Sequence, residues 1–531
     1  MKLSKIRQSH YLLPDNMTKK SFLDTLGQEF VVKQVENTFE KMAILDSFEW
    51  ALYEHRILAV RHDNQRISLW FDEEDILDPD EAHTIEDINA RTQFWWQLAE
   101  SPERDILKKL LDLRAMYPVY EGLLRTEQFN LMDNDGKILV FCQLITISRP
   151  ENSRKAVFRM ARLIPITGYK AQSKQASELI KSLGGFMPKL NPIDSLLSAL
   201  GVTPKPFNIK PRLDLDPQMS SREAASVIIS IMIDKQRQTE PGIIKDIDTE
   251  FLHHYRVALR MVRAAVAQLK EVFPPQDVIE LKQRFGALAS ETNHLRDLDV
   301  FILDKERYMA LLPPSLRDGL LPMFNDFEQS RTAEVRRIAR WLASRVYKQE
   351  ITELEDRFKN GYSALETHWS EQPIINLAVT KIQKRYKKIQ KAAAKITHDT
   401  PDQDIHDIRI DCKKLRYLLY FFGNLFNKKQ VKIAGRHLKA LQDHLGIFND
   451  LSVQAEFLEN YLDEIEHKSK KDIMLIASLG GLISSLHTMQ LQERERCIDA
   501  LAVFSNEENQ RLFKQTFVLE QGSKKEKGGR K

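Results

Sequence analysis

The pattern of hydrophobic and polar positions divides the chain into two parts of different periodicity. Before residue 201, short β-branched or aromatic runs bounded by Asp, Asn and Gly predict strands, with two stretches of helical period between them. The predicted strands are 56–61, 66–71 and 137–147, and the predicted helices are 102–116 and 174–183. We therefore expect an α+β domain over residues 1–201.

After residue 217, apolar residues recur with a period of 3.6, which predicts long helices. The windows are 221–235, 247–273, 276–303, 315–346, 373–396, 403–426, 430–445, 451–465 and 471–504. They predict an all-α region over residues 219–510. Six prolines between residues 188 and 217 predict a linker at 202–218, and the polar, basic residues 511–531 predict a disordered tail.

Composition and length fit a soluble multidomain protein. The 531 residues exceed one domain, and 42% hydrophobic with 29% charged residues is ordinary for a globular chain. Three scattered cysteines argue against a disulfide framework or a cysteine-based zinc site, so we expect a cytoplasmic location. The apolar window 473–491 contains serines, a His and a Gln, which predicts a helix buried in a bundle rather than a membrane span.

An internal repeat lies in the helical part. The segment His253-x-x-Arg256-Val257-x-x-Arg260-x-x-Arg263 recurs 153 residues later as His406-x-x-Arg409-Ile410-x-x-Lys413-x-x-Arg416. At the same offset, Arg296-Asp297-Leu298-Asp299-Val300 matches Asn449-Asp450-Leu451-Ser452-Val453, Phe273 matches Phe426, and Leu288 matches Leu441. This register predicts a tandem duplication, with two four-helix bundles at about 219–358 and 373–507 related by a pseudo-twofold axis.

The repeated His and basic residues form one stripe on each helix. At about 100° per residue, the four positions fall within an arc of about 80°. We call His253, Arg256, Arg260 and Arg263 the first stripe, and His406, Arg409, Lys413 and Arg416 the second stripe. The rest of the first helix is apolar or small, so we expect the stripe to face an internal groove.

Buried cations need neutralisation, and two sources are open. One is a salt-bridge network with acids of other helices, such as Asp297 and Asp299, and the other is an anionic ligand. Repetition of the stripe favours the ligand. Further basic rows on neighbouring helices suit a chain of phosphates, because Arg and Lys match phosphate oxygens. These rows are Lys381, Lys384, Arg385, Lys387, Lys388, Lys391 and Lys395, and Lys432, Arg436 and Lys439.

The two stripes and the Arg-Asp-Leu-Asp-Val and Asn-Asp-Leu-Ser-Val segments resemble the CHAD domain, the conserved-histidine α-helical domain, over about residues 220–507. The resemblance implies a pair of four-helix bundles whose basic surface binds inorganic polyphosphate at polyphosphate granules, without catalysis or cofactor. The binding residues implied by the resemblance are His253, Arg256, Arg260, Arg263, His406, Arg409, Lys413 and Arg416. From the neighbouring basic positions we add Arg296, Lys384, Lys388, Lys391, Arg436 and Lys439 to the predicted polyphosphate site. Lys413 keeps the charge of its counterpart Arg260 but loses bidentate geometry.

The first part resembles a degenerate CYTH domain, the triphosphate tunnel fold. Leu45-Asp46-Ser47, Leu52 and Leu58-Ala59-Val60-Arg61 are similar to one passage of that family. Val31 and Ala59 stand where the family has an acid and an arginine, and residues 156–162 contain no acid. The resemblance therefore implies a β-barrel tunnel without its metal and phosphate residues, and we expect no triphosphatase activity.

Other chemistry has weaker support. The acidic run 72–81 lacks EF-hand spacing and predicts a solvated loop, and the histidines lack zinc-site spacing. We expect the stripe histidines to bind phosphate or a neighbouring helix, with stronger binding below pH ~6.5. A triphosphatase and a nucleic-acid-binding protein remain alternatives, although only Tyr255, Tyr417 and Tyr420 could stack on bases near the stripes. No membrane partner is expected.

Overall fold

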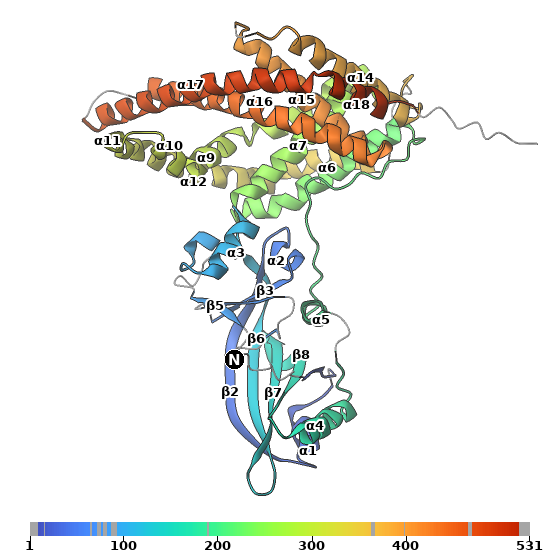
Figure 1. Cartoon of the computed structure of the whole chain (residues 1–531), viewed down its shortest axis with the longest axis vertical. Coiled ribbons are helices and arrows are strands. Elements are labelled where there is room, and N and C mark those ends of the chain that lie inside the picture. The colour runs from blue at the N-terminus through green and yellow to red at the C-terminus, as the bar shows by residue number, and fades with distance from the viewer. Residues whose placement is uncertain are drawn as a thin grey trace, which may run out of the picture. The chain divides into compact units, whose positions relative to one another are not determined.

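The chain forms two units in the computed structural model, Met1–Asn208 and Ile209–Lys531, and each is described by itself (Figure 1). The structure describes residues 9–14, 16–63, 66–71, 76–77, 82–86, 93–187, 191–359, 361–362, 367–397, 399–465 and 470–519. The acidic run 72–81 lies outside these residues except for positions 76 and 77.

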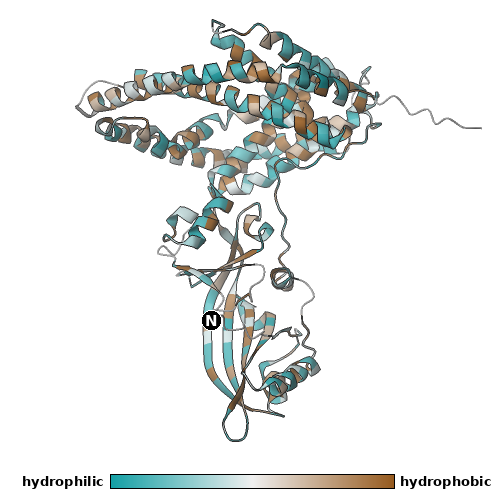
Figure 2. Ribbon diagram, viewed as in Figure 1, coloured by the Kyte–Doolittle hydropathy of each residue, from teal (hydrophilic) through white to brown (hydrophobic). Residues whose placement is uncertain are grey.

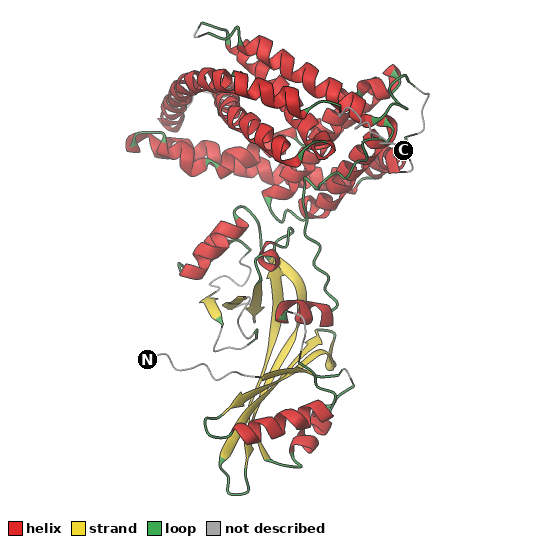
Figure 3. Ribbon diagram, turned by 45° about the vertical axis from the view of Figure 1, so that its right-hand side comes forward, coloured by secondary structure: helices red, strands yellow, loops and turns green. Residues whose placement is uncertain are grey.

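The first unit contains one antiparallel sheet in the order β1-β8-β7-β6-β2-β3-β4-β5 (Figure 3). Its strands are β1 (Ser9–Leu12), β2 (Val31–Asp46), β3 (Ile57–His62), β4 (Arg66–Phe71), β5 (His83–Glu86), β6 (Tyr117–Met132), β7 (Ile138–Arg149) and β8 (Asn152–Pro165). The predicted α+β class is confirmed, and the three predicted strands correspond to β3, β4 and β7.

The long strands β2 and β6 were missed by the sequence pattern. They pair along their whole length, from Val31 opposite Met132 to Asp46 opposite Tyr117. Most side chains in the first ten residues of β2 are exposed, so this stretch has no alternation of apolar and polar positions. Backbone hydrogen bonds to β6, rather than burial, define this stretch as a strand.

Helices cover parts of this sheet and complete its core. They are α1 (Lys19–Leu26), α2 (Ala51–Glu54), α3 (Pro102–Leu111), α4 (Lys170–Ser182) and α5 (Pro192–Ala199). Phe22 of α1 and Ile180 of α4 are fully buried against β6 and β7 residues such as Phe129 and Val140. The predicted helix 102–116 ends earlier, because Asp112 has a positive φ of 49°.

The second unit is helical, as predicted. Its helices are α6 (Ser221–Ile244), α7 (Thr249–Gln268), α8 (Pro275–Ser290), α9 (Asn293–Leu303), α10 (Lys305–Ala310), α11 (Pro314–Arg317), α12 (Leu321–Ala343), α13 (Arg345–Lys359), α14 (Ile374–Ala393), α15 (Asp402–Phe422), α16 (Lys428–Asp463), α17 (Lys470–Phe504) and α18 (Glu507–Thr516). Brown and teal residues alternate around these helices in Figure 2, as expected where each helix buries one face.

The two halves differ at one point of the repeat. The predicted helix 276–303 divides at Glu291 and Thr292 into α8 and α9, whereas the predicted helices 430–445 and 451–465 merge into the 36-residue α16. Asn293, the first residue of α9, corresponds in the 153-residue offset to Gly446 in the middle of α16. The first half therefore exposes polar groups at a helix break where the second half has continuous helix.

The chain end is ordered further than predicted. Helix α18 continues to Thr516, past the start of the predicted tail at residue 511. The ring of Phe513 stacks on Tyr386 with centroids 3.9 Å apart, and Phe517 is fully buried. These two aromatic residues fix a segment that the polar sequence around it predicted as disordered.

Helix α17 is the apolar helix predicted from residues 473–491. Leu475, Leu479, Leu482 and Leu486 form a buried row in a cluster with residues of α9 and α12. The opposite side is open, with Ile473 65% exposed. By length and composition alone, one helix of the described residues, Asp472–Phe504, could cross a membrane.

Candidate anion-binding groove

The first stripe lies on α7 and borders an open groove. Asp248 caps the helix by accepting from the backbone N–H groups of Glu250 and Phe251. Arg260 and Arg263 are exposed, whereas His253 and Arg256 are half-buried. The expectation of a fully internal stripe is therefore wrong. Apolar residues of α7 are buried beneath the groove floor, and the longer arginine side chains extend past them to water.

A first cavity of about 300 Å³ lies between α7, α8 and α9. Its lining residues are His253, Arg256, Arg260, Arg263, Ala289, Asn293 and Arg296. Four arginines line this cavity without a carboxylate. One nitrogen of Arg296, Nη1, is buried and has no hydrogen-bond partner among the described residues. The cavity therefore offers strong donors to an anion.

Arg256 is held by neutral oxygens rather than by acids. Its Nη1 donates to the carbonyl of Ala289 (3.2 Å), the hydroxyl of Thr292 (2.9 Å) and Oδ1 of Asn293 (2.9 Å), all at the break between α8 and α9. Burial lowers the pKa of Arg256, and the neighbouring arginines lower it further, while Asp297 acts in the opposite direction. The guanidinium charge is thus positioned but not cancelled.

The two acids considered as partners do not form ion pairs with the first stripe in the described residues. Asp299 is 1% exposed and binds Arg331 of α12 at 2.7 Å. Asp297 is close enough to influence Arg256, but no ion pair joins them. A salt-bridge network therefore does not account for Arg260 and Arg263.

A second cavity of about 330 Å³ lies between α7 and α15. Its lining residues are Lys210, His253, Val257, Arg260, Met261, Lys413, Arg416, Tyr417 and Tyr420. His253 and Arg260 line both cavities, so the two cavities lie side by side along α7. We call the two cavities together the basic groove.

The second stripe divides between the basic groove and α16. His406 Nδ1 donates to Oδ1 of Asn449 at 2.7 Å, and Arg409 lies 3.5 Å from the carboxylate of Asp450. Lys413 and Arg416 line the groove, and Nη1 of Arg416 also donates to Oε1 of Gln442 on α16 at 3.3 Å. Burial lowers the pKa of Lys413 to about 8, and Arg409, Arg260 and Arg416 contribute, whereas Asp450 opposes them.

The predicted row on α14 lies away from the groove. Lys388 forms an ion pair with Asp411 of α15 at 2.8 Å, and Asp411 lies about 180° around α15 from the second stripe. Helix α14 therefore packs on the opposite side of α15. Lys384 and Lys391, exposed on α14, line neither cavity.

The predicted row on α16 is also turned away. Asn449 marks the side of α16 that faces the second stripe, and Arg436 lies about 140° around the helix from it. Lys439 forms an ion pair within α16 with Asp443 at 2.7 Å. Helical spacing identified these rows but not the side on which each helix packs.

Four groove residues were missed by the sequence reasoning as binding groups. Lys210 lies in the predicted linker, Asn293 lies at the helix break, and Tyr417 and Tyr420 lie one and four residues after Arg416, the last residue of the second stripe. The sequence analysis named the two tyrosines only as rings that could stack on bases. Lys210 reaches the groove through the path of an irregular segment, which no periodicity encodes.

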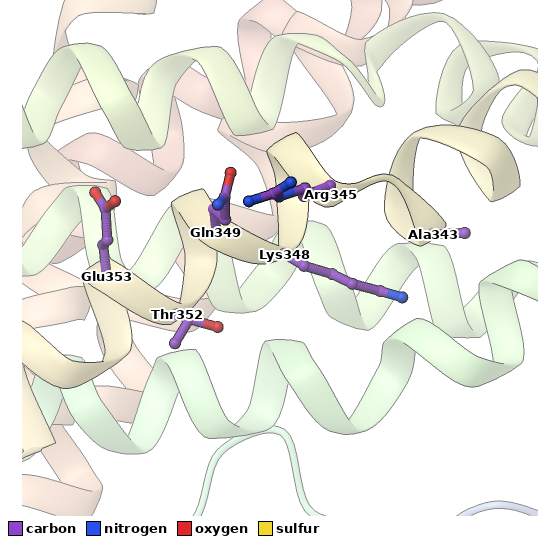
Figure 4. A pocket seen from close by; sticks show the side chains of 6 residues that line it. All are labelled: Ala343, Arg345, Lys348, Gln349, Thr352 and Glu353. Carbon is purple, nitrogen blue, oxygen red and sulfur yellow. The ribbon is translucent and has the colours of Figure 1, made fainter.

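A third hollow, of about 500 Å³, lies at the junction of α12 and α13 (Figure 4). Its side chains do not converge, because Lys348 and Thr352 point to one side of α13 and Glu353 to the other. Among the described residues, no group of three His, Cys, Asp or Glu side chains could hold a metal ion. The basic groove is therefore the candidate anion-binding site of the helical unit.

The helical unit with its basic groove belongs to a known class of domain. A family model, the CHAD domain, matches residues 228–459, which include both stripes. The chain therefore carries a CHAD domain in its helical unit. A search of curated proteins found no match.

Solved structures similar to this chain include three of different origin. The CHAD domain from the plant Ricinus communis has 23% identity and a TM-score of 0.47, covering 56% of this chain and 96% of its own. PptA from Streptomyces chartreusis has 13% identity and a TM-score of 0.39, covering 56% and 99%. A putative adenylyl cyclase from Hippeastrum with a dominant triphosphatase activity has 10% identity and a TM-score of 0.24, covering 37% and 96%.

Proposed function

We propose that the helical unit binds inorganic polyphosphate in the basic groove, without catalysis. One observation carries this proposal: two adjacent cavities whose lining contains no carboxylate are lined by His253, Arg256, Arg260, Arg263, Arg296, Lys413 and Arg416. The six arginine and lysine side chains among them repel one another when the groove is empty, and a linear polyanion removes that repulsion. We further propose that the protein associates with cytoplasmic polyphosphate granules.

The N-terminal unit is proposed to be a degenerate CYTH-like domain without triphosphatase activity. Position 31 is the first residue of β2 and holds Val, and residues 156–162 of β8 contain no acid. At these two places the CYTH family has carboxylates that hold a catalytic magnesium ion, and their replacement in this chain supports the proposal. A magnesium-dependent triphosphate hydrolysis assay on the full chain tests this proposal, and sustained phosphate release would contradict it.

Single-stranded nucleic acid is the second candidate ligand. Tyr417 and Tyr420 line the second cavity beside four cations, and aromatic rings beside cations are typical of single-strand binding sites. However, the hydroxyl of Tyr420 already donates to the carbonyl of Pro211 at 2.9 Å, which fixes the ring as part of the wall. Competition between long-chain polyphosphate and RNA for the full chain, at matched charge and salt, separates the two ligands.

Binding is expected to depend steeply on salt. If at least four phosphates displace counterions, with a slope of about 0.9 each as for DNA, affinity should fall by about 100-fold between about 50 and 200 mM salt. Fluorescence anisotropy with end-labelled polyphosphate measures this slope. An affinity that does not change with salt would contradict a charge-driven groove.

Binding is also expected to weaken above pH 8. Lys413 has a pKa of about 8 in the empty groove, and a bound phosphate favours its charged form. Affinity should fall by up to about tenfold per pH unit above that pH, until the pKa of Lys413 in the bound state is reached. The empty protein should gain stability over the same range, because the unfolded lysine, with a pKa of about 10.4, then binds more protons than the folded one.

Lys413→Arg provides the matched control for this pH dependence. The guanidinium stays charged throughout the range, so the fall in affinity should move to higher pH. Anisotropy titrations from about pH 7 to 9.5 on both proteins measure the difference. An identical pH profile for the two proteins would exclude Lys413 as the responsible group.

A further inference from the structure

The segment that precedes α6 is fixed to α15, although its prolines predicted a linker. Tyr420 of α15 donates to the carbonyl of Pro211 at 2.9 Å, and Nδ2 of Asn424 donates to the carbonyl of Leu215 at 3.2 Å. The side chains of Leu213 and Leu215 are buried, with 3% and 5% exposure. Two polar anchors and two apolar ones therefore hold this segment in one position on the helical unit.

This anchoring places Lys210 at the basic groove. Lys210 lines the second cavity with Lys413 and Arg416. Burial lowers the pKa of Lys210, and Arg416 and Arg260 lower it further, which shows how close these cations are. The following residue, Pro211, disfavours helical backbone at Lys210, so fewer conformations are lost when Lys210 binds.

We propose that residues 209–216 form a strap that completes the basic groove, and that Lys210 is a phosphate-binding residue supplied by this strap. The inference rests on the proposed polyanion-binding function and adds a part of the site from outside the repeated helices. Lys210, Lys413 and Arg416 come from the strap and from α15, so a phosphate in the second cavity would contact both. The first cavity, whose cationic side chains are all arginines, has no residue of the strap among its lining.

The first test removes the strap cation. Lys210→Ala should lower the affinity for long-chain polyphosphate by about 5- to 10-fold. The slope of log affinity against log salt should become shallower by about 1, the value for one phosphate contact. Lys210→Arg should restore most of the affinity, because the charge returns. Lys205→Ala is the matched control, since Lys205 lies in the same Pro-rich segment but lines neither cavity, and it should bind like the wild type.

The second test weakens the anchor without changing charge. Tyr420→Phe removes the hydrogen bond to Pro211, so trypsin should cleave after the exposed Arg212 faster than in the wild type. Saturating polyphosphate should slow that cleavage in the wild type. Mass spectrometry of the fragments measures the rate at this one bond, and a wild-type rate in Tyr420→Phe would overturn the anchored strap.

The outcomes separate this inference from the proposed function. If the wild type binds polyphosphate and Lys210→Ala binds it with equal affinity and salt slope, the strap inference is wrong and the groove proposal stands. An equal loss in Lys205→Ala and Lys210→Ala would also overturn the inference, because it would indicate a general charge effect. If the wild type does not bind polyphosphate, the proposed function itself fails.

Discussion

Arg260→Glu is expected to abolish most polyphosphate binding and to raise the melting temperature of the empty protein. Arg260 lines both cavities, and its charge lowers the pKa of Arg256, Arg409 and Lys413. A carboxylate at this position would attract those cations and repel phosphate. Reversed charge in the middle of the groove should cost several kcal/mol of binding, or more than about 100-fold in affinity.

The stability gain should be small, because Arg260 is exposed and solvent screens it. An increase of a few degrees in melting temperature is the expected scale. Arg336→Glu on the exposed side of α12 is the matched control, with the same charge change away from the groove. Wild-type affinity in Arg260→Glu, or an equal loss in both proteins, would contradict the assignment of the groove.

The double change Arg256→Ala with Arg409→Ala should remove most binding and leave the fold intact. The acceptors of Arg256 are neutral, and Asp450, the partner of Arg409, is 67% exposed and stays hydrated after truncation. No buried charge is left behind, so the free energy of unfolding should change by no more than about 1 kcal/mol. Arg256 lines the first cavity, whereas Arg409 lines neither cavity and pairs with Asp450, so the loss comes mainly from one charge-assisted contact and should be at least about 10-fold.

Arg331→Ala gives the contrasting case on the same fold. Its partner Asp299 is 1% exposed, so truncation strands a buried carboxylate and should cost ~3–5 kcal/mol. Thermal melts and binding curves on both variants distinguish a ligand-binding role of the stripes from a structural one. A large fall in melting temperature with retained binding in the Arg256 and Arg409 double variant would mean that the stripes are structural.

Helical periodicity was enough to predict the angular position of each stripe residue. Positions 253, 256, 260 and 263 share one side of α7 because 3.6 residues complete a turn. Their angular positions therefore follow from the sequence alone, without knowledge of the helices that pack against α7. For the same reason, Lys413 and Arg416 were placed together on α15. The sequence could therefore supply most of the groove, since a duplicated helix carries its pattern in the chain itself.

Contacts between helices were not predictable in the same way. The α14 row is basic and periodic, but Asp411 on the far side of α15 binds Lys388 and fixes that helix away from the groove. The same limit applies to Lys210, whose position depends on hydrogen bonds from Tyr420 and Asn424 to a segment without regular structure. Spacing describes one element, whereas these positions depend on which elements pack together.

The two ends of the basic groove are chemically different. Arg256, Arg263 and Arg296 line one cavity, and Lys210 and two tyrosines line the other. Inorganic polyphosphate has the same structure when followed from either terminus, so it can enter such a groove in two equivalent orientations. This degeneracy contributes RT ln 2, about 0.4 kcal/mol, to its binding free energy. RNA runs from 5′ to 3′, so its two orientations differ in energy, and the unlike ends of the groove would select one of them.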